Sequence, residues 1–367
     1  MEDGHVLRNV VVGGGPRAAL GGNIILPRRG PFRVIAGPAF FGLVILVASS
    51  APGSAQRLRG SAGDVLRADS LLAAGQMFAA ESIYYQASRE RPRDPVARLA
   101  LGIYLAGRGA VKVGSVLMEE ARYFGGDTKA VAAALAPVYD RLRDYRALAS
   151  LVGSPLPPAE RKRAEWLAGQ PREITGPDSS SLALASPGDT EHELGIVALV
   201  VGRDTLQATI DPSVTGLVLD TTMASHSGAK RLFVSAGTTA GADARRISSV
   251  SGPVRLGELQ LSTVPTRYAT IGRRNARLGL DVIEALRPTF DQTAGSLVLR
   301  LPADPKQPPR RFPGATLPIY FARDALLVFL DDRLVPITSP AAAPILRGRK
   351  WTLDARHGAI VLAPPTR

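Results

Sequence analysis

Two aspartates end similar apolar stretches of the chain, and a pair of carboxylates can do acid–base chemistry. Asp211 ends the stretch 200–211 (VVGRDTLQATID), and Asp331 ends the stretch 320–331 (YFARDALLVFLD). Two carboxylates that lie close together cannot both ionise cheaply, so they share one proton, and one acts as base while the other acts as acid. Asp211 and Asp331 are candidates for such a pair if the fold brings them together.

Other catalytic patterns receive little support. The chain has no cysteine and four scattered histidines, so we predict neither a metal site nor a cofactor. Residues 10–18 (VVVGGGPRA) look like a dinucleotide-binding glycine fingerprint, but Pro27, arginines and an apolar run follow instead of the helix and acidic residue that it needs. A Ser-His hydrolase built on Ser225 or Ser227 beside His226 would lack a nucleophile elbow.

Composition indicates a folded protein of several domains. The 367 residues are 45% hydrophobic, which is enough for a sizeable core and favours two or three domains. The net charge of +13 is spread among acidic residues with few aromatics nearby. This pattern is typical of a solvated basic surface, so no nucleic-acid partner is predicted.

The N-terminal region has the pattern of an export signal. Residues 34–48 (VIAGPAFFGLVILVA) are apolar, follow Arg28, Arg29 and Arg33, and precede the small-residue stretch SSAPGSA. The apolar run is shorter than the roughly 20 residues that span a bilayer comfortably. We therefore predict that residues 1–55 are a signal peptide cleaved after Ala55, with a retained membrane anchor as the alternative, and that the protein is exported to the periplasm or another extracytoplasmic space.

Residues 63–151 are predicted to form helical hairpins. Alanine and leucine recur at helical spacing, and the segment matches itself at a period of 34 residues. The corresponding positions are Leu71, Leu105 and Tyr139, then Gly75, Gly109 and Arg143, then Ala87 and Ala121. The period and the small residues resemble the tetratricopeptide repeat, whose concave face often binds peptides or partner proteins. A helical domain that only packs on its neighbour is an equal alternative.

Residues 152–189 are rich in proline, serine and glycine and are predicted to be a linker, with one short helical piece around Trp166. After residue 190 the pattern changes to alternating apolar residues with Gly, Asp and Pro between them, which indicates short strands and turns.

Three segments in fixed order resemble the retropepsin-like aspartic peptidases. The first is 196–219, in which a hairpin delivers Asp211 and a Gly-apolar strand follows. The second is the glycine-marked hairpin 254–269. The third is 278–301, an apolar-Gly-apolar-Asp strand followed by a short helix and a closing hairpin. The resemblance implies a retropepsin-like β domain at residues 190–303 with Asp211 as the family's aspartate.

A second register places the family's aspartate at Asp220, in LVLDTTMAS. It keeps Asp-Thr, but it puts Thr222 at the family's glycine and needs an extra residue afterwards. We prefer Asp211, because the downstream Gly-apolar strand then aligns without a gap.

The chain after residue 310 echoes the β domain. Besides the stretch 320–331, residues 351–362 (WTLDARHGAIVL) repeat residues 288–299 (PTFDQTAGSLVL). We interpret residues 310–367 as an abbreviated second β lobe that lacks the flap and the helix. The family needs two facing aspartates, supplied by a homodimer or by a duplicated lobe, and Asp331 occupies the echo position.

The family's motif is altered at Asp211. Its Asp-Thr-Gly is here Asp211-Pro212-Ser213. Proline offers neither a hydroxyl nor an amide proton, and serine lacks the backbone freedom of glycine. Asp331 is followed by Asp332 and Arg333, charges that would perturb a shared proton. A loosely held dyad is expected to lose several powers of ten in rate.

The predicted fold class is an α+β multidomain protein, with an α-helical repeat segment before an all-β retropepsin-like barrel and its abbreviated second lobe. The first functional hypothesis is an exported protein with this fold that is catalytically impaired and binds a peptide or protein. The alternative is an active extracytoplasmic aspartic endopeptidase that uses Asp211. The fold alone does not decide between them.

Overall fold

The structure is a computed structural model that describes residues 52–364 except 155, 172, 187–192, 226–229, 237–244, 252, 272–275, 302–313 and 323–324. The apolar run 34–48, the glycine-rich stretch 10–18, His226 and Ser227 lie outside the described residues. The predictions made on them stay predictions.

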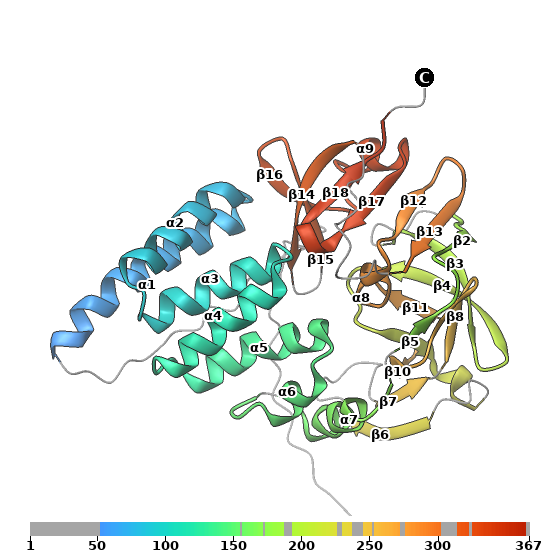
Figure 1. Ribbon diagram of the computed structural model, residues 1–367, viewed down its shortest axis with the longest axis horizontal. Coiled ribbons are helices and arrows are strands. Elements are labelled where there is room, and N and C mark those ends of the chain that lie inside the picture. The colour runs from blue at the N-terminus through green and yellow to red at the C-terminus, as the bar shows by residue number, and fades with distance from the viewer. Residues whose placement is uncertain are drawn as a thin grey trace, which may run out of the picture. The chain divides into compact units, whose positions relative to one another are not determined.

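The first part of the described chain is helical (Figure 1). Its helices are α1 (Pro52–Ala73), α2 (Met77–Glu90), α3 (Pro95–Gly107), α4 (Val111–Tyr123), α5 (Thr128–Leu142), α6 (Tyr145–Ser150) and α7 (Pro158–Ala168). Aspartates define several helix starts, because the side chains of Asp94, Asp127 and Asp144 accept hydrogen bonds from backbone amides of the first turn of α3, α5 and α6.

The turns inside the helical hairpins fall at the predicted spacing. Gly75, Gly109 and Arg143, each 34 residues after the one before, have positive φ angles of 81°, 88° and 56°. Glycine adopts this left-handed conformation without a steric penalty, whereas arginine does so at a cost. The 34-residue period of the sequence therefore corresponds to left-handed turns at these three positions.

Ten strands of the described chain form one sheet, and its order places strands from distant parts of the sequence side by side. In order across the sheet they are β1 (Ile174–Thr175), β9 (Leu259–Leu261), β8 (Val254–Leu256), β3 (Gly195–Val201), β4 (Asp204–Asp211), β11 (Ala276–Gly279), β5 (Leu217–Asp220), β10 (Val264–Ala269), β7 (Arg245–Ser251) and β6 (Lys230–Ala236).

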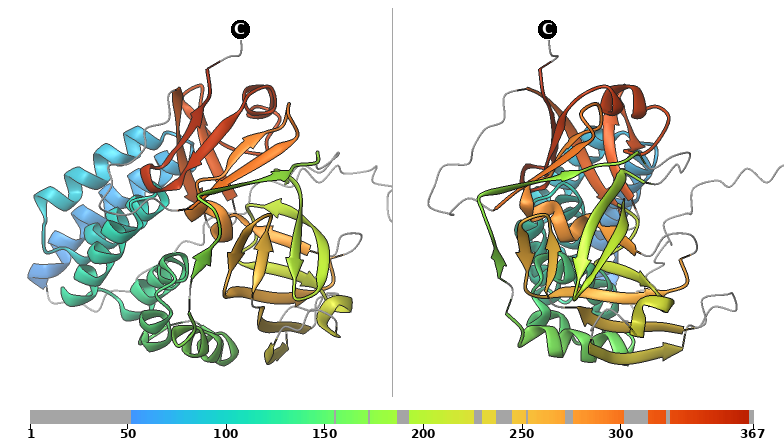
Figure 2. Two further views of the ribbon diagram at one scale, coloured as in Figure 1. Left: turned by 45° about the vertical axis from the view of Figure 1, so that its right-hand side comes forward. Right: turned by 90° about the vertical axis from the view of Figure 1, so that its right-hand side faces the viewer.

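Eight further strands form a second sheet made largely of hairpins (Figure 2). They are β16 (Arg333–Pro336), β15 (Ala325–Leu330), β14 (Ala315–Ala322), β18 (Ala359–Leu362), β17 (Trp351–Asp354), β12 (Thr289–Asp291), β13 (Ser296–Arg300) and β2 (Ser179–Ala183). One hydrophobic core extends through both sheets, from Leu182 to Leu362. The predicted order of a helical segment followed by a β region is confirmed. The predicted linker range 152–189 contains α7, β1 and β2, and both strands pair within the sheets.

The two closing hairpins, β12–β13 and β17–β18, make reciprocal contacts across a local two-fold axis. Thr289 and Thr352, which correspond in the sequence echo, face each other with their hydroxyl oxygens 2.8 Å apart. Arg287 pairs with Asp354 at 3.1 Å. The corresponding pair, Lys350 and Asp291, is 4.0 Å apart. Such exchange of equivalent contacts is the mark of a two-fold interface.

The C-terminal echo also keeps a helix. The short helix α9 (Ala343–Arg347) ends shortly before β17, as α8 (Leu280–Ile283) and the 3-10 turn η2 (Glu284–Leu286) precede β12. Leu346 of α9 and Ile283 of α8, which correspond in the echo, are both buried. The expectation that this region lacks the helix is therefore wrong. The pattern was missed because APILR is short and contains proline.

The turns of the helical hairpins contact the β region. The Gly75 carbonyl accepts a hydrogen bond from the Leu334 amide at 3.1 Å. Arg108, beside the second turn, donates to the carbonyl oxygens of Ile319 and Gly358. Arg143 donates to the carbonyl oxygen of Asp281 at 3.1 Å. The turns at Gly75, Gly109 and Arg143 thus lie on an edge of the helical array (α1–α7) that contacts the β region.

Gly109 and Gly125 provide a matched test of this contact. Both have positive φ, but a Cβ on Gly109 would lie 2.3 Å from the Ala355 carbonyl oxygen, whereas a Cβ on Gly125 would meet nothing within 4 Å. Gly125→Ala should cost roughly 1–2 kcal/mol of unfolding free energy from backbone strain. Gly109→Ala should cost roughly 1–3 kcal/mol more, because the backbone of the β region must move. Urea unfolding of both variants measures the difference, and equal costs would contradict the contact.

The threonine pair on the two-fold axis should show energetic coupling. Thr352→Val leaves Thr289 with the hydrogen bond that it accepts from Arg300 at 2.6 Å. Thr289→Val instead removes a hydrogen-bond partner from both Thr352 and Arg300. We expect Thr289→Val to be the more destabilising of the two. The double variant should be less destabilised than the sum, by about 0.5–1.5 kcal/mol. A double-mutant cycle by chemical unfolding tests this, and additive costs would speak against the pair.

Candidate functional site

Asp211 is the last residue of β4, and its carboxylate is held by its own chain. The residue is 3% exposed. Its Oδ1 atom accepts hydrogen bonds from the Ser213 amide at 2.8 Å and from the Ser213 hydroxyl at 2.6 Å. Ser213, expected to be a poor substitute for glycine, thus supplies two donors to one carboxylate oxygen.

The Asp211 turn lies where β11 is inserted between β4 and β5. The strand β11 runs between β4 and β5, parallel to the first and antiparallel to the second, and Gly279 lies opposite Asp211. The Gly279 amide donates to the Gly216 carbonyl oxygen at 2.7 Å. A Cβ on Gly279 would lie 2.6 Å from the Val214 carbonyl oxygen, so only glycine fits. Asp211 thus ends an interior strand of the ten-stranded sheet, between β3 and β11.

Asp281 closes the loop that follows Asp211. Both of its carboxylate oxygens accept from the Gly216 amide, at 2.9 and 3.1 Å. Burial raises the pKa of Asp281 to about 7, while the bond from Gly216 acts in the opposite direction. The sequence pattern includes Asp281 but gives it no role. Its spacing of two residues after Gly279 is the signal that could have found it.

A cation faces the other oxygen of Asp211. The Arg277 guanidinium lies 3.6 Å from Asp211 Oδ2. Arg277 is in β11, next to the crossing, and its side chain is 41% exposed. Oδ1 and Oδ2 of Asp211 therefore face a serine and an arginine of the same chain.

Asp331 occupies a different kind of position. It forms a two-residue turn with Asp332 between β15 and β16, with φ angles of 47° and 61°. Two consecutive positive φ angles are typical of the tight turns that join hairpin strands. Asp331 is exposed. No contact among the described residues joins it to Asp211, so their catalytic pairing stays a prediction. The Asp-Asp dipeptide between two apolar runs is the signal for this turn.

Asp220, the alternative family aspartate, ends β5 and has a closed turn of its own. Its Oδ1 accepts from the Thr222 amide at 3.0 Å and from the Thr222 hydroxyl at 2.7 Å, and its Oδ2 accepts from the Ile271 amide at 3.1 Å. The bonds from the amide and hydroxyl of Thr222 lower the pKa of Asp220. Both candidate aspartates therefore end strands in turns of the same design.

In the described part of the chain, no three histidine, aspartate or glutamate side chains lie close enough together to bind a metal ion.

Comparison with known proteins gives one kind of likeness. No protein-family model matches the chain, and no curated protein matches it. Among solved structures, the chain is similar to a retropepsin-like aspartic protease from Rickettsia conorii over 36% of this chain and 95% of that one, with 12% sequence identity and a TM-score of 0.26. The likeness concerns the fold over part of the chain and does not transfer the role of any residue.

Removing the cation beside Asp211 should weaken the fold modestly. Arg277→Met leaves the buried carboxylate without its charged neighbour, and because Arg277 is partly exposed we expect a loss of about 0.2–1 kcal/mol at pH 7. The loss should shrink at high salt, because dissolved ions screen a partly exposed ion pair. The exposed Arg255 in β8 provides the control variant Arg255→Met, which should have almost no effect. Thermal unfolding at pH 7 in low and in high salt measures both variants, and a loss that does not depend on salt would argue against the ion pair.

Proposed function

We propose that this chain is an exported protein with a retropepsin-like fold that is catalytically impaired and acts as a peptide- or protein-binding module. The observation that carries the proposal is the surroundings of the Asp211 carboxylate. Its two oxygens face Ser213 and Arg277 rather than a second carboxylate.

Hydrolysis by an aspartate dyad requires two carboxylates that exchange one proton near the scissile carbonyl. Asp331, the second carboxylate of the sequence hypothesis, is an exposed turn residue of another sheet. The positions of threonine and glycine in the family motif are taken by Pro212 and Ser213. These features favour binding over catalysis.

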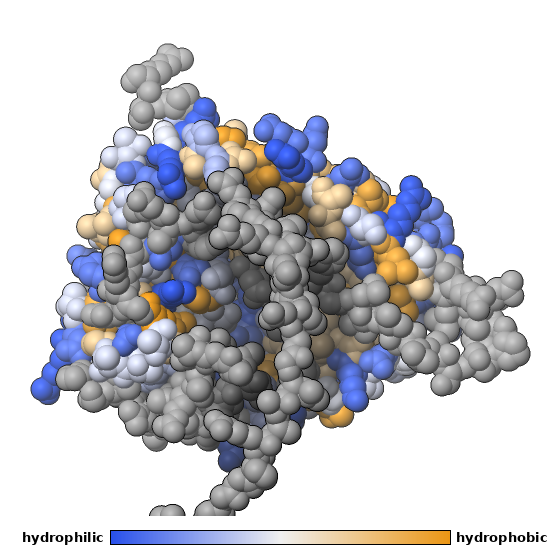
Figure 3. Space-filling model, turned by 180° about the vertical axis from the view of Figure 1, so that it is seen from behind, coloured by the Kyte–Doolittle hydropathy of each residue, from blue (hydrophilic) through white to orange (hydrophobic). Residues whose placement is uncertain are grey.

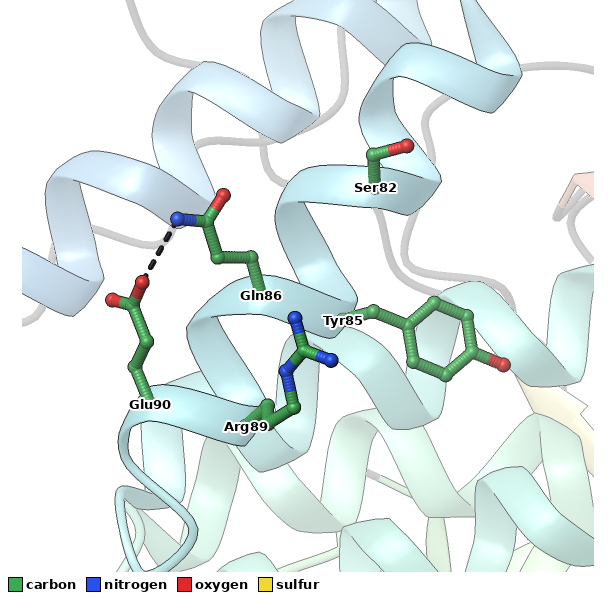
Figure 4. A pocket seen from close by; sticks show the side chains of 5 residues that line it. All are labelled: Ser82, Tyr85, Gln86, Arg89 and Glu90. Carbon is green, nitrogen blue, oxygen red and sulfur yellow. Dashed lines mark hydrogen bonds between the residues drawn. The ribbon is translucent and has the colours of Figure 1, made fainter.

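The helical hairpins offer surfaces suited to a partner. A hollow of about 420 Å³ on α2 is lined by Ser82, Tyr85, Gln86, Arg89 and Glu90, with Gln86 donating to Glu90 (Figure 4). A second hollow, of about 330 Å³, lies on α4 at positions that largely correspond through the 34-residue period. Tyr123 in it is 85% exposed. Figure 3 shows hydrophobic and hydrophilic residues intermixed on the visible part of one face of the molecule.

Export and a possible membrane anchor belong to the proposal and rest on the sequence of residues 1–55. In the described part of the chain, no helix is long and apolar enough to cross a membrane.

One observation favours the alternative, an active aspartic endopeptidase. Asp211 lies at a strand crossing and accepts a bond from the amide two residues later, an arrangement that holds a carboxylate rigidly. Under this alternative a second aspartate would come from another copy of the chain, so the active form would be a homodimer.

Cleavage of denatured casein between pH 3 and pH 7 by the purified full chain, with and without pepstatin, distinguishes the two functions. We expect no pepstatin-sensitive cleavage, because the partners of the Asp211 carboxylate among the described residues are Ser213 and Arg277 and not a second carboxylate. Asp211→Asn and Asp331→Asn serve as matched variants. Cleavage abolished by Asp211→Asn alone would overturn the proposal in favour of a homodimeric enzyme, and cleavage abolished by either variant would favour a dyad within one chain.

A further inference from the structure

The turn between α5 and α6 binds the segment 280–286 of the β region through hydrogen bonds. Arg143 donates to the carbonyl oxygens of Asp281 at 3.1 Å and Val282 at 3.4 Å. Arg141 pairs with Glu284 through two hydrogen bonds of 3.1 Å each. The Arg141 guanidinium also stacks over the Phe321 ring at 3.6 Å. Two arginines therefore hold this short segment from one side.

The same segment holds the Asp211 loop from the other side. The Asp281 carboxylate accepts from the Gly216 amide, and Gly216 ends the loop that begins at Asp211. One residue thus binds the helical array through its backbone and the candidate site through its side chain. A change in Asp281 must affect both.

Charges surround Asp281 unevenly. Asp140 from α5 and Glu284 from η2 disfavour its ionised form, and Arg143 from the α5–α6 turn favours it. Arg141 is paired with Glu284, and Tyr145 of α6 is also close enough to interact electrostatically. Arg163 of α7 lies 3.8 Å from Asp140 and offsets part of its charge. The nearby acids and arginines thus partly offset one another, and burial is the main cause that disfavours the ionised form of Asp281.

We propose that Asp281 is a pH-responsive latch between the helical array and the Asp211 loop. When neutral, its carboxyl group rests against Gly216 without a buried charge, and the contact is closed. When ionised, its carboxylate is better solvated in water than in this buried position, so opening of the segment 280–286 and of the loop becomes easier.

The direction of the pH effect follows from the raised pKa of Asp281. The closed state keeps its proton up to about pH 7, whereas an opened, solvated aspartate releases it near its ordinary value of 3.8. The closed state is therefore favoured most at low pH and loses stability against the open state as the pH rises toward 7. Above that pH the loss is complete, because the group is ionised in both states. The latch operates whether the loop serves binding or catalysis.

Hydrogen exchange of the full chain, read by mass spectrometry on peptides that cover 212–217 and 280–286, tests the latch. Protection factors, corrected for the intrinsic rate at each pH, are compared at pH 4.5 and pH 7.5. We expect the wild type to lose protection in both segments by a large factor, on the order of 100-fold, as the closed state gives up its preference. Asp281→Asn keeps an acceptor for Gly216 but does not titrate, so its protection should not change with pH.

Asp220→Asn is the matched control, because Asp220 also ends a strand and accepts from backbone amides but has a lowered pKa. It should retain the pH dependence of the wild type. Constant protection in the wild type, or the same loss in Asp281→Asn, would refute the latch. Should Asp281→Asn fail to fold, a carbon NMR titration of the wild-type carboxyl decides: a midpoint near 7 supports the latch, and one near 4 rules it out.

Discussion

The passage of β11 between β4 and β5 is the constraint on which the rest of the β region depends. Gly279 lies opposite Asp211 at this crossing, and there is no room for a side chain between it and the carbonyl oxygens of Val214 and Gly216. The position of Gly279 therefore fixes the loop that follows Asp211. Asp281, two residues later, fixes the end of the same loop through the Gly216 amide. One short segment determines where the candidate aspartate lies and how its turn is closed.

The helical array also contacts the regions of both closing hairpins, β12–β13 with the preceding helix α8 and β17–β18. Its second turn meets the C-terminal copy at Ala355 and Gly358, and its third turn meets the first copy at Asp281 and Val282. The two copies also contact each other directly through Thr289 and Thr352. A short β segment buries little surface alone, so a second neighbour that covers it contributes to its stability. The left-handed turns at Gly109 and Arg143 thus contact the β region as well as reversing the chain.

Much of this architecture could be predicted from the sequence, and the limits have physical causes. The period of 34 residues aligned Gly75, Gly109 and Arg143 because the sequence repeats locally, although their left-handed conformation became apparent only in the structure. Alternating apolar residues identified the hairpins for the same reason. The contacts of those turns could not be predicted, because Arg108 and its partner Ile319 are 211 residues apart and no local pattern joins them. The echo suggested Asp331 as a partner for Asp211, but a hairpin can match another in sequence while its last residue enters a turn.

The turns at Asp211 and Asp220 indicate what a single carboxylate does in this fold. In each, the aspartate ends a strand and accepts both the amide and the hydroxyl of the residue two positions later, Ser213 in one case and Thr222 in the other. Such side-chain bonds close a turn without any second carboxylate. A buried carboxylate is tolerated when its oxygens are satisfied, so Asp211 has a structural reason to be present. Peptide hydrolysis requires two such groups, whereas strand termination requires one. Within a single chain, the surroundings of Asp211 meet the requirement for strand termination.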